Sequence, residues 1–196
     1  MSTTEDKQSH HHGNLRPALV AAGIAMLERG ERFSLRAVAR EVGVSQTAPY
    51  RHFPDKAHLE AAMASTGFET MKRRMENVLA HSTPRSQVLT DLAVAYVRFA
   101  AENPALYDLM FSISTCGDDR LPASAEVFSL LEGTVAEHYP QADTYGLTTA
   151  SWSMAHGLAS LFLSGQLPVT TPEELDARVT GAFSAILPSA PAGEDA

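Results

Sequence analysis

The stretch FSLRAVAREVGVSQTAPYRHFPDK, residues 33–56, decides the fold of this chain. Ser34 stands where a helix N-cap is expected, apolar residues then recur at helical spacing, and Gly43 follows the last of them as a C-terminal stop. Ser45 is a second N-cap candidate, and Pro49 and Pro54 keep the helix after it short. A helix, a glycine turn and a short helix make the layout of a helix-turn-helix.

The short second helix carries side chains that suit base edges and DNA phosphates. They are Gln46, Thr47, Ala48, Tyr50, Arg51 and His52. Lys56 lies in the first turn of the next helix, after the N-cap residue Asp55. The helix macrodipole disfavours a cation at that end unless an external anion is nearby, and a DNA phosphate would supply one.

The pattern GVSxxxxYRHFPDK, after a capped helix that carries arginines, resembles the TetR-type bacterial transcriptional regulators. The resemblance implies phosphate contacts for Arg36, Tyr50, His52 and Lys56, and base contacts for the residues between Ser45 and Pro49. The DNA-binding residues predicted in this way are Arg36, Ser45, Gln46, Thr47, Ala48, Tyr50, His52 and Lys56. A surface three-helix motif with an incidental basic edge is the alternative.

The charge is divided unevenly along the 196 residues. Residues 13–60 hold seven Lys or Arg against five Asp or Glu, or +2, whereas the chain from residue 61 onward holds seven against sixteen, or −9. Residues 1–12 supply the remaining −1 of the net charge of −8. Positive charge is therefore concentrated at the motif, which fits a DNA-binding domain better than a non-specific architectural DNA-binding protein.

We expect a cytoplasmic protein, because a single cysteine, Cys116, cannot form an intrachain disulfide and the N-terminus lacks the pattern of a signal peptide. Cys116 is either a redox sensor or a small apolar residue. The run His10, His11 and His12 is either a native segment opening the first helix, which we favour, or a tag or metal cluster.

Helical periodicity predicts an all-α fold of about nine helices. Besides the two helices of the motif, we expect helices over 15–28, 55–81, 84–102, 104–111, 123–138, 144–165 and 172–187. The predicted domains are a disordered tail over 1–12, a three-helix DNA-binding domain over 13–60, a C-terminal ligand-binding and dimerisation domain over 61–187, and a tail over 188–196.

Residues 144–172 contain no Asp, Glu, Lys or Arg, and the helix there has two uncharged seams. One comprises Leu147, Ser151, Met154, Leu158, Leu161 and Gly165, and the other comprises Tyr145, Thr149, Trp152, His156, Ala159 and Leu163. One seam can face its own domain, and the other needs a partner. A membrane span is the rival interpretation, which eight Ser and Thr residues between 148 and 171 disfavour. The predicted dimer-interface residues are Leu147, Met154, Leu158, Leu161 and Phe183.

The segment NPALYDLMFS and the pattern Trp152-x-x-x-His156-Gly157 resemble the C-terminal domain of one TetR subgroup, the Trp-His-Gly (WHG) group. The resemblance implies that the last two helices pair with a second copy and that the other helices enclose a small-molecule site. The predicted pocket residues are Tyr96, Phe99, Tyr107, Met110, Phe111, Phe128, Trp152 and His156. A plain core of Met and aromatic residues is the alternative.

The predicted function is therefore a ligand-responsive, dimeric repressor that binds a near-palindromic operator and is released by a small apolar or amphipathic effector. A cytosolic enzyme using His156 or Cys116 is the alternative from another class. No nucleophile elbow, phosphate-binding loop or HExxH motif supports it. We accordingly expect no catalytic residue, no metal and no cofactor.

Overall fold

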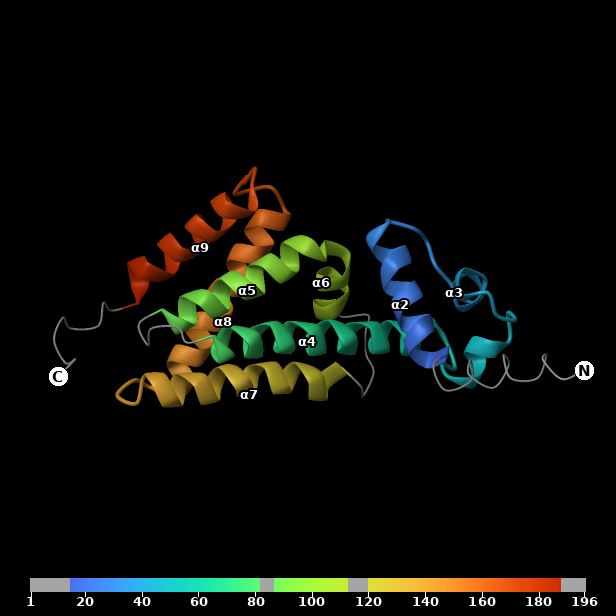
Figure 1. The fold of residues 1–196 in the computed structure, drawn as a ribbon, viewed down its shortest axis with the longest axis horizontal. Helices are drawn as coiled ribbons and strands as arrows, with labels where there is room; N and C mark the ends of the chain where they lie inside the picture. Colours follow the sequence, from blue (N-terminus) through green and yellow to red (C-terminus); the bar gives the residue numbers. More distant parts are fainter. Residues whose placement is uncertain (1–14, 82–86, 113–119, 188–196) are drawn as a thin grey trace, which may run out of the picture. The chain divides into compact units, whose positions relative to one another are not determined.

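The structure is a computed structural model that describes residues 15–81, 87–112 and 120–187. Over these residues it is all-α, with eight α-helices and one 3₁₀ turn, η1 (Figure 1). The predicted all-α fold class is therefore confirmed. His10 to His12, Pro84 and Cys116 lie outside the described residues. No described helix has both the length and the apolar character that crossing a membrane requires.

The chain divides into two compact units. The N-terminal unit comprises residues 1–67 and 105–122, and the C-terminal unit comprises residues 68–104 and 123–196. The division falls inside one continuous helix, α4 (Lys56–Ala80). The predicted domain boundary at residue 60 stays a prediction, but residues 105–112 belong to the N-terminal unit although they come late in the chain.

The N-terminal unit begins with α2 (Leu15–Glu28) and α3 (Leu35–Val42). The hydroxyl of Ser34 accepts a hydrogen bond from the backbone N–H of Ala37, so the predicted N-cap is present. Gly43 ends α3 in the left-handed conformation, with φ of 77°, which a side chain would strain. These local signals determine the bounds of α3.

The second helix of the motif is shorter than predicted. It is a single 3₁₀ turn, η1 (Ala48–Arg51), because Pro49 has no N–H to donate to a carbonyl four residues earlier. The N–H of Ala48 instead bonds the carbonyl oxygen of Ser45 at 3.0 Å. The predicted capping role of Ser45 is wrong, since its hydroxyl lies 3.2 Å from that of Thr47.

Helix α6 (Pro104–Phe111) packs within the N-terminal unit. The carboxylate of Glu28, at the end of α2, accepts hydrogen bonds from the backbone N–H of Leu106 at 2.8 Å and of Ala105 at 3.3 Å. Gly67 on α4 lies so close to Met110 that an added Cβ would sit 2.5 Å from its sulfur. These contacts hold α6 against α2 and the first half of α4.

The C-terminal unit is built around α5 (Val88–Glu102), which packs against both α8 (Thr144–Leu163) and α9 (Pro172–Ile186) (Figure 1). Helix α7 (Arg120–His138) begins three residues earlier than predicted. Asp143 caps α8 by accepting from the N–H of Gly146, and Thr171 caps α9 by accepting from the N–H of Glu174. The core of this unit is formed by α5 and the helices around it.

Candidate nucleic-acid interface and internal pocket

The residues predicted to bind DNA lie at the surface of the N-terminal unit. Arg36 on α3 is exposed, and Tyr50 on η1 is 48 % exposed. Pro49 and Phe53 are buried, so they anchor the turn to the core of the unit while neighbouring side chains stay exposed. The exposed members of the set are Arg36, Ser45, Gln46, Thr47, Tyr50 and Lys56; Ala48 and His52 are half-buried.

The carboxylates between residues 15 and 67 are all engaged inside the unit. Glu28 holds α6, and Glu31 and Glu41 both bond Arg29, at 2.6 and 3.2 Å. Asp55 caps α4 through the N–H of His58, at 3.0 Å, and Glu60 pairs with Lys56. The pKa of Asp55 is lowered by hydrogen bonds from the His58 side chain and backbone, so this carboxylate stays ionised.

Four arginines of the N-terminal unit have no carboxylate partner among the described residues. They are Arg32, Arg36, Arg40 and Arg51. All four are exposed. Their charge is therefore open to an external anion, and the hydroxyl and amide groups of the nearby turn can bond bases or phosphates.

Lys56, in the first turn of α4, has a carboxylate partner on its own helix, which corrects the prediction that it needs an external anion. Its ammonium group lies 2.6 Å from the carboxylate of Glu60, one helical turn further on, and 4.7 Å from the centre of the Phe33 ring. The helix's own carboxylate therefore stabilises this cation, and its position does not require an external anion. Lys56 remains half-exposed and able to meet a phosphate as well.

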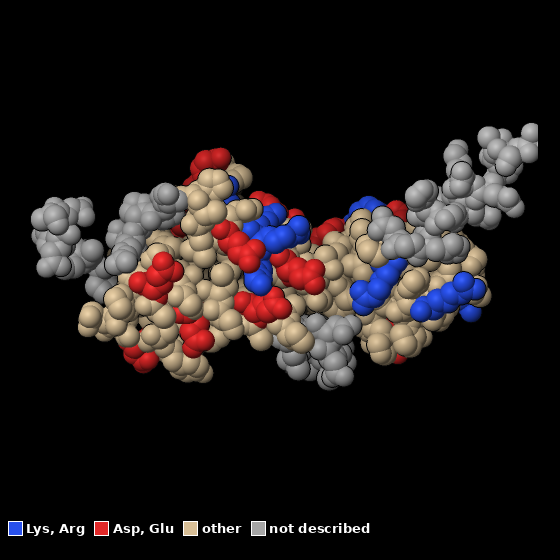
Figure 2. Space-filling model, turned by 60° about the horizontal axis from the view of Figure 1, so that its bottom comes forward, with Lys and Arg blue, Asp and Glu red and all other residues tan. Residues whose placement is uncertain are grey.

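Figure 2 shows the resulting contrast in charge on one face of the molecule. Over the N-terminal unit, most of the blue Lys and Arg atoms stand apart from acidic ones. Over the C-terminal unit, blue and red atoms lie together, and further red side chains stand alone. Isolated cations beside exposed hydrogen-bonding groups are the features of a surface for a polyanion.

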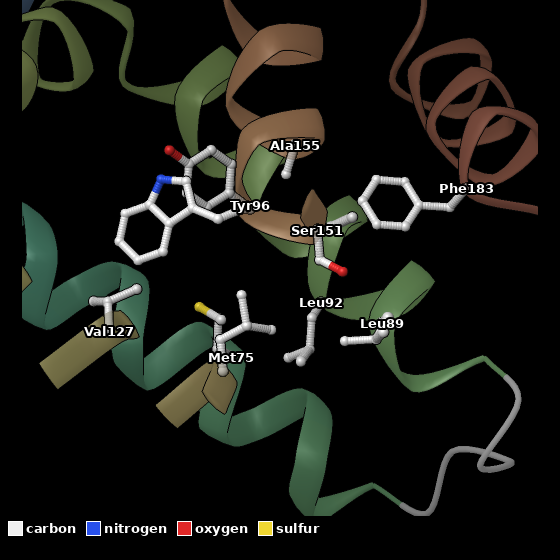
Figure 3. Close-up of a pocket in the computed structure, with 11 residues that line it drawn as sticks. Met75, Leu89, Leu92, Tyr96, Val127, Ser151, Ala155 and Phe183 are labelled. Carbon is white, nitrogen blue, oxygen red and sulfur yellow. The ribbon is translucent and has the colours of Figure 1, made fainter. Parts of the chain in front are cut away.

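The C-terminal unit contains a cavity with an empty volume of about 330 Å³, including the space at its open mouth (Figure 3). Tyr96 contributes to its wall, and the tyrosine hydroxyl lies 3.1 Å from Nδ1 of His156. Burial lowers the pKa of His156, which favours the neutral imidazole. The lining residues are Met75, Leu89, Leu92, Ala93, Tyr96, Val127, Leu131, Ser151, Trp152, Ala155 and Phe183.

Two family models match the two parts of the chain. One, described as bacterial regulatory proteins of the tetR family, matches residues 19–63, and the other, described as a tetracyclin repressor-like C-terminal domain, matches residues 89–186. The second match alone spans half of the chain. The chain belongs to the TetR family. It is a DNA-binding transcriptional regulator with a helix-turn-helix, and members of this family are not enzymes.

Curated relatives of this TetR-family chain include a nucleoid occlusion factor SlmA from Alteromonas mediterranea, 32 % identical over 126 residues. That match covers 61 % of this chain and 63 % of the relative, so the chain spans less than two thirds of the relative's length. A second such factor, from a Marinomonas species, is 27 % identical and is covered over 71 % of its length.

Solved structures share the fold across nearly the whole chain. A protein of unknown function from Rhodococcus sp. RHA1 has a TM-score of 0.77 and 28 % identity, with coverage of 92 % of this chain and 98 % of that one. A TetR/AcrR-family regulator from Thermobifida fusca has a TM-score of 0.69 and 15 % identity, covering 87 % and 96 %. At the second level of identity, the likeness concerns the fold alone.

The structure gathers only part of the predicted pocket in this TetR-family regulator. Tyr96 and Trp152 line the cavity, while His156 and Phe128 contact them from behind: the Phe128 and Trp152 ring centres are 5.5 Å apart. Phe99 is buried under the guanidinium of Arg74 and does not line the cavity. The residues that lie in the N-terminal unit instead are Tyr107, Met110 and Phe111.

One predicted interface residue is inside the fold. Phe183 is 1 % exposed and lines the cavity, so in this conformation its ring cannot contact a second copy. Leu161 is exposed on α8, and the other predicted interface residues, Leu147, Met154 and Leu158, are half-buried. The buried face of α8 comprises Thr148, Ser151, Ala155 and Ala159. It takes Ser151 from one predicted seam and Ala159 from the other, and its other two residues lie between the seams.

Sequence reasoning missed most of the aliphatic wall of the cavity, including Leu89, Leu92 and Leu131. An apolar stripe at helical spacing has the same pattern whether it meets a neighbouring helix or a void, so no signal was available. Ser151 belongs to one of the predicted seams and is the one polar residue of that seam. Among the described residues, no cluster of His, Asp or Glu could hold a metal ion.

Proposed function

We propose that this regulator is a repressor that acts in the cytoplasm as a homodimer, binds a near-palindromic operator through α3 and η1, and leaves the DNA when a small effector enters the C-terminal unit. The observation that carries the DNA-binding part is the set of four exposed arginines that make no ion pair with any described residue, close in the chain to the exposed groups of residues 45–50. Phosphate contacts would position the motif, and Gln46 and Thr47 would read bases.

Selection of bound duplexes from a random-sequence library tests this proposal. A dimer presents two motifs to successive major grooves about 34 Å apart, so the selected sequences should share two half-sites related by a twofold axis. A non-specific architectural protein would enrich no consensus, and an enzyme with an incidental basic edge would retain no DNA at physiological salt.

The dimer part is supported by the outer face of α8. Leu161 is 36 % exposed and Leu163 is 39 % exposed, although residues 144–172 contain no charged side chain. On α9, the exposed residues include small ones that allow close helix packing: Ala177, Gly181, Ser184 and Ala185. An apolar face without charges on a water-soluble regulator favours a partner helix, and a second copy offers the same face.

Sedimentation velocity tests the interface with the double variant Leu158→Asp/Leu161→Asp. A buried unpaired charge is costly, so the variant should sediment as a monomer or aggregate. The matched control is Ala136→Asp on the exposed side of α7, which should leave the dimer intact. A double variant that remains a dimer would place the interface elsewhere.

The effector part is supported by the cavity and by the aromatic residues around it. We also place the chain in the WHG subgroup, because Trp152 lines the cavity and His156, one turn later, contacts Tyr96 of the cavity wall. The effector must bind the DNA-free and DNA-bound states unequally to release the operator. The coupling is reciprocal, so operator DNA should weaken effector binding by the factor by which effector weakens DNA binding.

Nucleoid occlusion, the role in the name of the curated relatives, is the second candidate. The identity of 32 % over 126 residues favours it. Genome-wide mapping of bound sites separates the two candidates. A repressor should occupy a few sites at promoters, whereas a factor acting on the nucleoid should occupy many sites without regard to promoters.

A further inference from the structure

The hydroxyl of Ser151 is a buried polar group without a partner. Ser151 lies on the inner face of α8 and is 6 % exposed. In the part of the chain that the structure describes, its Oγ makes no hydrogen bond. Buried hydroxyl groups are nearly always hydrogen-bonded, because leaving one unpaired destabilises the fold.

Other buried hydroxyls of the same unit show what Ser151 could do and does not. Oγ1 of Thr148 donates to the carbonyl of Thr144 at 2.7 Å, and Oγ1 of Thr134 donates to the carbonyl of Leu130 at 2.8 Å. Both bonds run back one helical turn, which is the usual way for a helix to satisfy a buried hydroxyl. Figure 3 shows the hydroxyl of Ser151 directed into the space between the lining side chains instead.

The walls around this hydroxyl are apolar and uncharged. Aliphatic side chains such as Leu89 and Leu92 form one part, and the rings of Tyr96, Trp152 and Phe183 form another. Among the described residues, no Asp, Glu, Lys, Arg or His lines the cavity, so a charged ligand would lose its hydration without gaining a partner from them. The rings favour a flat, apolar body packed edge-on or offset against them.

We propose that Ser151 is the polar anchor for a neutral ligand with a single ring, which carries one hydroxyl or carbonyl group. The inference rests on the proposed function, in which this cavity takes the effector. The serine hydroxyl accepts a hydrogen bond from a ligand hydroxyl or donates one to a ligand carbonyl, since it can act either way. The volume of about 330 Å³ includes the space at the open mouth and the enclosed part is much smaller, so the lining side chains must move apart to admit even one ring.

Phenol and toluene are a matched pair of probes, because they have nearly the same shape and differ by a hydroxyl in place of a methyl group. Calorimetry on the full chain should show phenol binding more tightly than toluene. Ser151→Ala should weaken phenol binding about two- to tenfold, the range of one net hydrogen bond, and leave toluene binding unchanged or tighter. Ser153→Ala, an exposed serine on the same helix, is the control and should change neither.

Thermal unfolding without ligand gives a second measurement. Ser151→Ala removes an unpaired buried hydroxyl, so its Tm should equal or exceed that of the wild type. Equal phenol affinity in the two proteins would overturn the anchor. A lower Tm for the variant, together with no phenol binding by the wild type, would mean that the hydroxyl holds only a water molecule, which overturns it too.

The duplex selection separates this inference from the function on which it rests. If the wild type selects a DNA consensus but does not distinguish phenol from toluene, the anchor fails and the regulator stands. If it distinguishes the probes through Ser151 but selects no consensus, the regulator proposal fails and the anchor stands.

Discussion

The two units of the molecule leave different groups without partners. In the C-terminal unit, every described Lys and Arg side chain has a partner: Lys72 pairs with Glu126, Arg74 with Glu102, Arg98 with Asp176 and Arg178 with Glu174, and Arg73 bonds the hydroxyl of Thr70. In residues 15–67 of the N-terminal unit, every carboxylate has a partner within the unit, whereas four arginines make no ion pair with any described residue. Among the described buried side-chain atoms of the C-terminal unit, the hydroxyl of Ser151 and Nδ1 of His138 make no hydrogen bond.

A group without a partner therefore indicates the kind of ligand more directly than the composition of its unit does. Exposed cations can be satisfied by a polyanion at low cost, whereas a hydroxyl inside an apolar cavity needs a small neutral molecule. The same chain thus carries two sites with opposite chemistry, and substitutions can test them one at a time.

The largest effect is expected from the double variant Arg36→Ala/Arg40→Ala. If both arginines meet phosphates, the log–log salt slope of DNA binding should flatten by about 2 per subunit, and affinity near 0.1 M salt should fall roughly a hundredfold for all sequences alike. Filter binding at several salt concentrations measures this. The control Arg73→Ala, in the C-terminal unit, should leave the salt slope unchanged. An unchanged slope in the double variant would contradict the proposed phosphate contacts.

The next effect concerns the stability of the N-terminal unit. Glu28→Ala leaves the N–H groups of Ala105 and Leu106 unpaired at the start of α6, which should lower the free energy of unfolding by about 1–3 kcal/mol. Urea unfolding followed by circular dichroism measures the loss. Glu28→Gln keeps an acceptor oxygen, so it should lower the free energy of unfolding by less than Glu28→Ala does. Glu31→Ala, an exposed partner of Arg29, should stay within about 0.5 kcal/mol of the wild type.

A smaller effect is expected at the pair of Lys56 and Glu60. If Glu60 competes with DNA for the ammonium group, Glu60→Gln should raise DNA affinity a few-fold, and Lys56→Ala should flatten the salt slope by about 1 per subunit. Equilibrium titration of both variants with one duplex measures whether the two substitutions change DNA affinity in opposite directions. Two variants that weaken DNA binding equally would show that the pair acts only through the structure of α4.

The smallest effect is a pH dependence in the C-terminal unit. Burial lowers the pKa of His156, so between the unfolded value of about 6.5 and the lower folded value the unfolded chain binds a proton that the folded chain does not. The free energy of unfolding should therefore fall as the pH falls through this window. His156→Gln should remove this contribution, whereas Tyr96→Phe should keep it, because desolvation and not the tyrosine is the cause.

The helix-turn-helix illustrates how far local pattern reaches. Ser34, Gly43 and Asp55 predicted the ends of α3 and the start of α4, because a cap is an interaction within about four residues. The effect of Pro49 is larger than predicted, because its missing N–H reduces the expected short second helix to one 3₁₀ turn. The surface position of the motif's polar residues followed from the same periodicity.

The C-terminal helices illustrate where local pattern stops. The uncharged run over 144–172 predicted a helix with more than one apolar side, but its buried face takes one residue from each predicted seam and two from between them. Phe183 belongs to the cavity wall and not to the interface, because α9 presents that side to α5. An apolar periodicity states that a face will be covered without stating what covers it.

The all-α class, the caps and breaks of the helices, the exposed basic motif and the family resemblance could all be predicted from local pattern, since each depends on residues close together in the chain. Which polar groups find hydrogen-bond partners could be seen only in the folded chain. Glu28 meets the N–H of Leu106 across 78 positions of sequence, and the hydroxyl of Ser151 meets no partner among the described residues. The physical reason is that hydrogen bonding and burial depend on which distant helix faces pack together, and that choice is made by the whole fold.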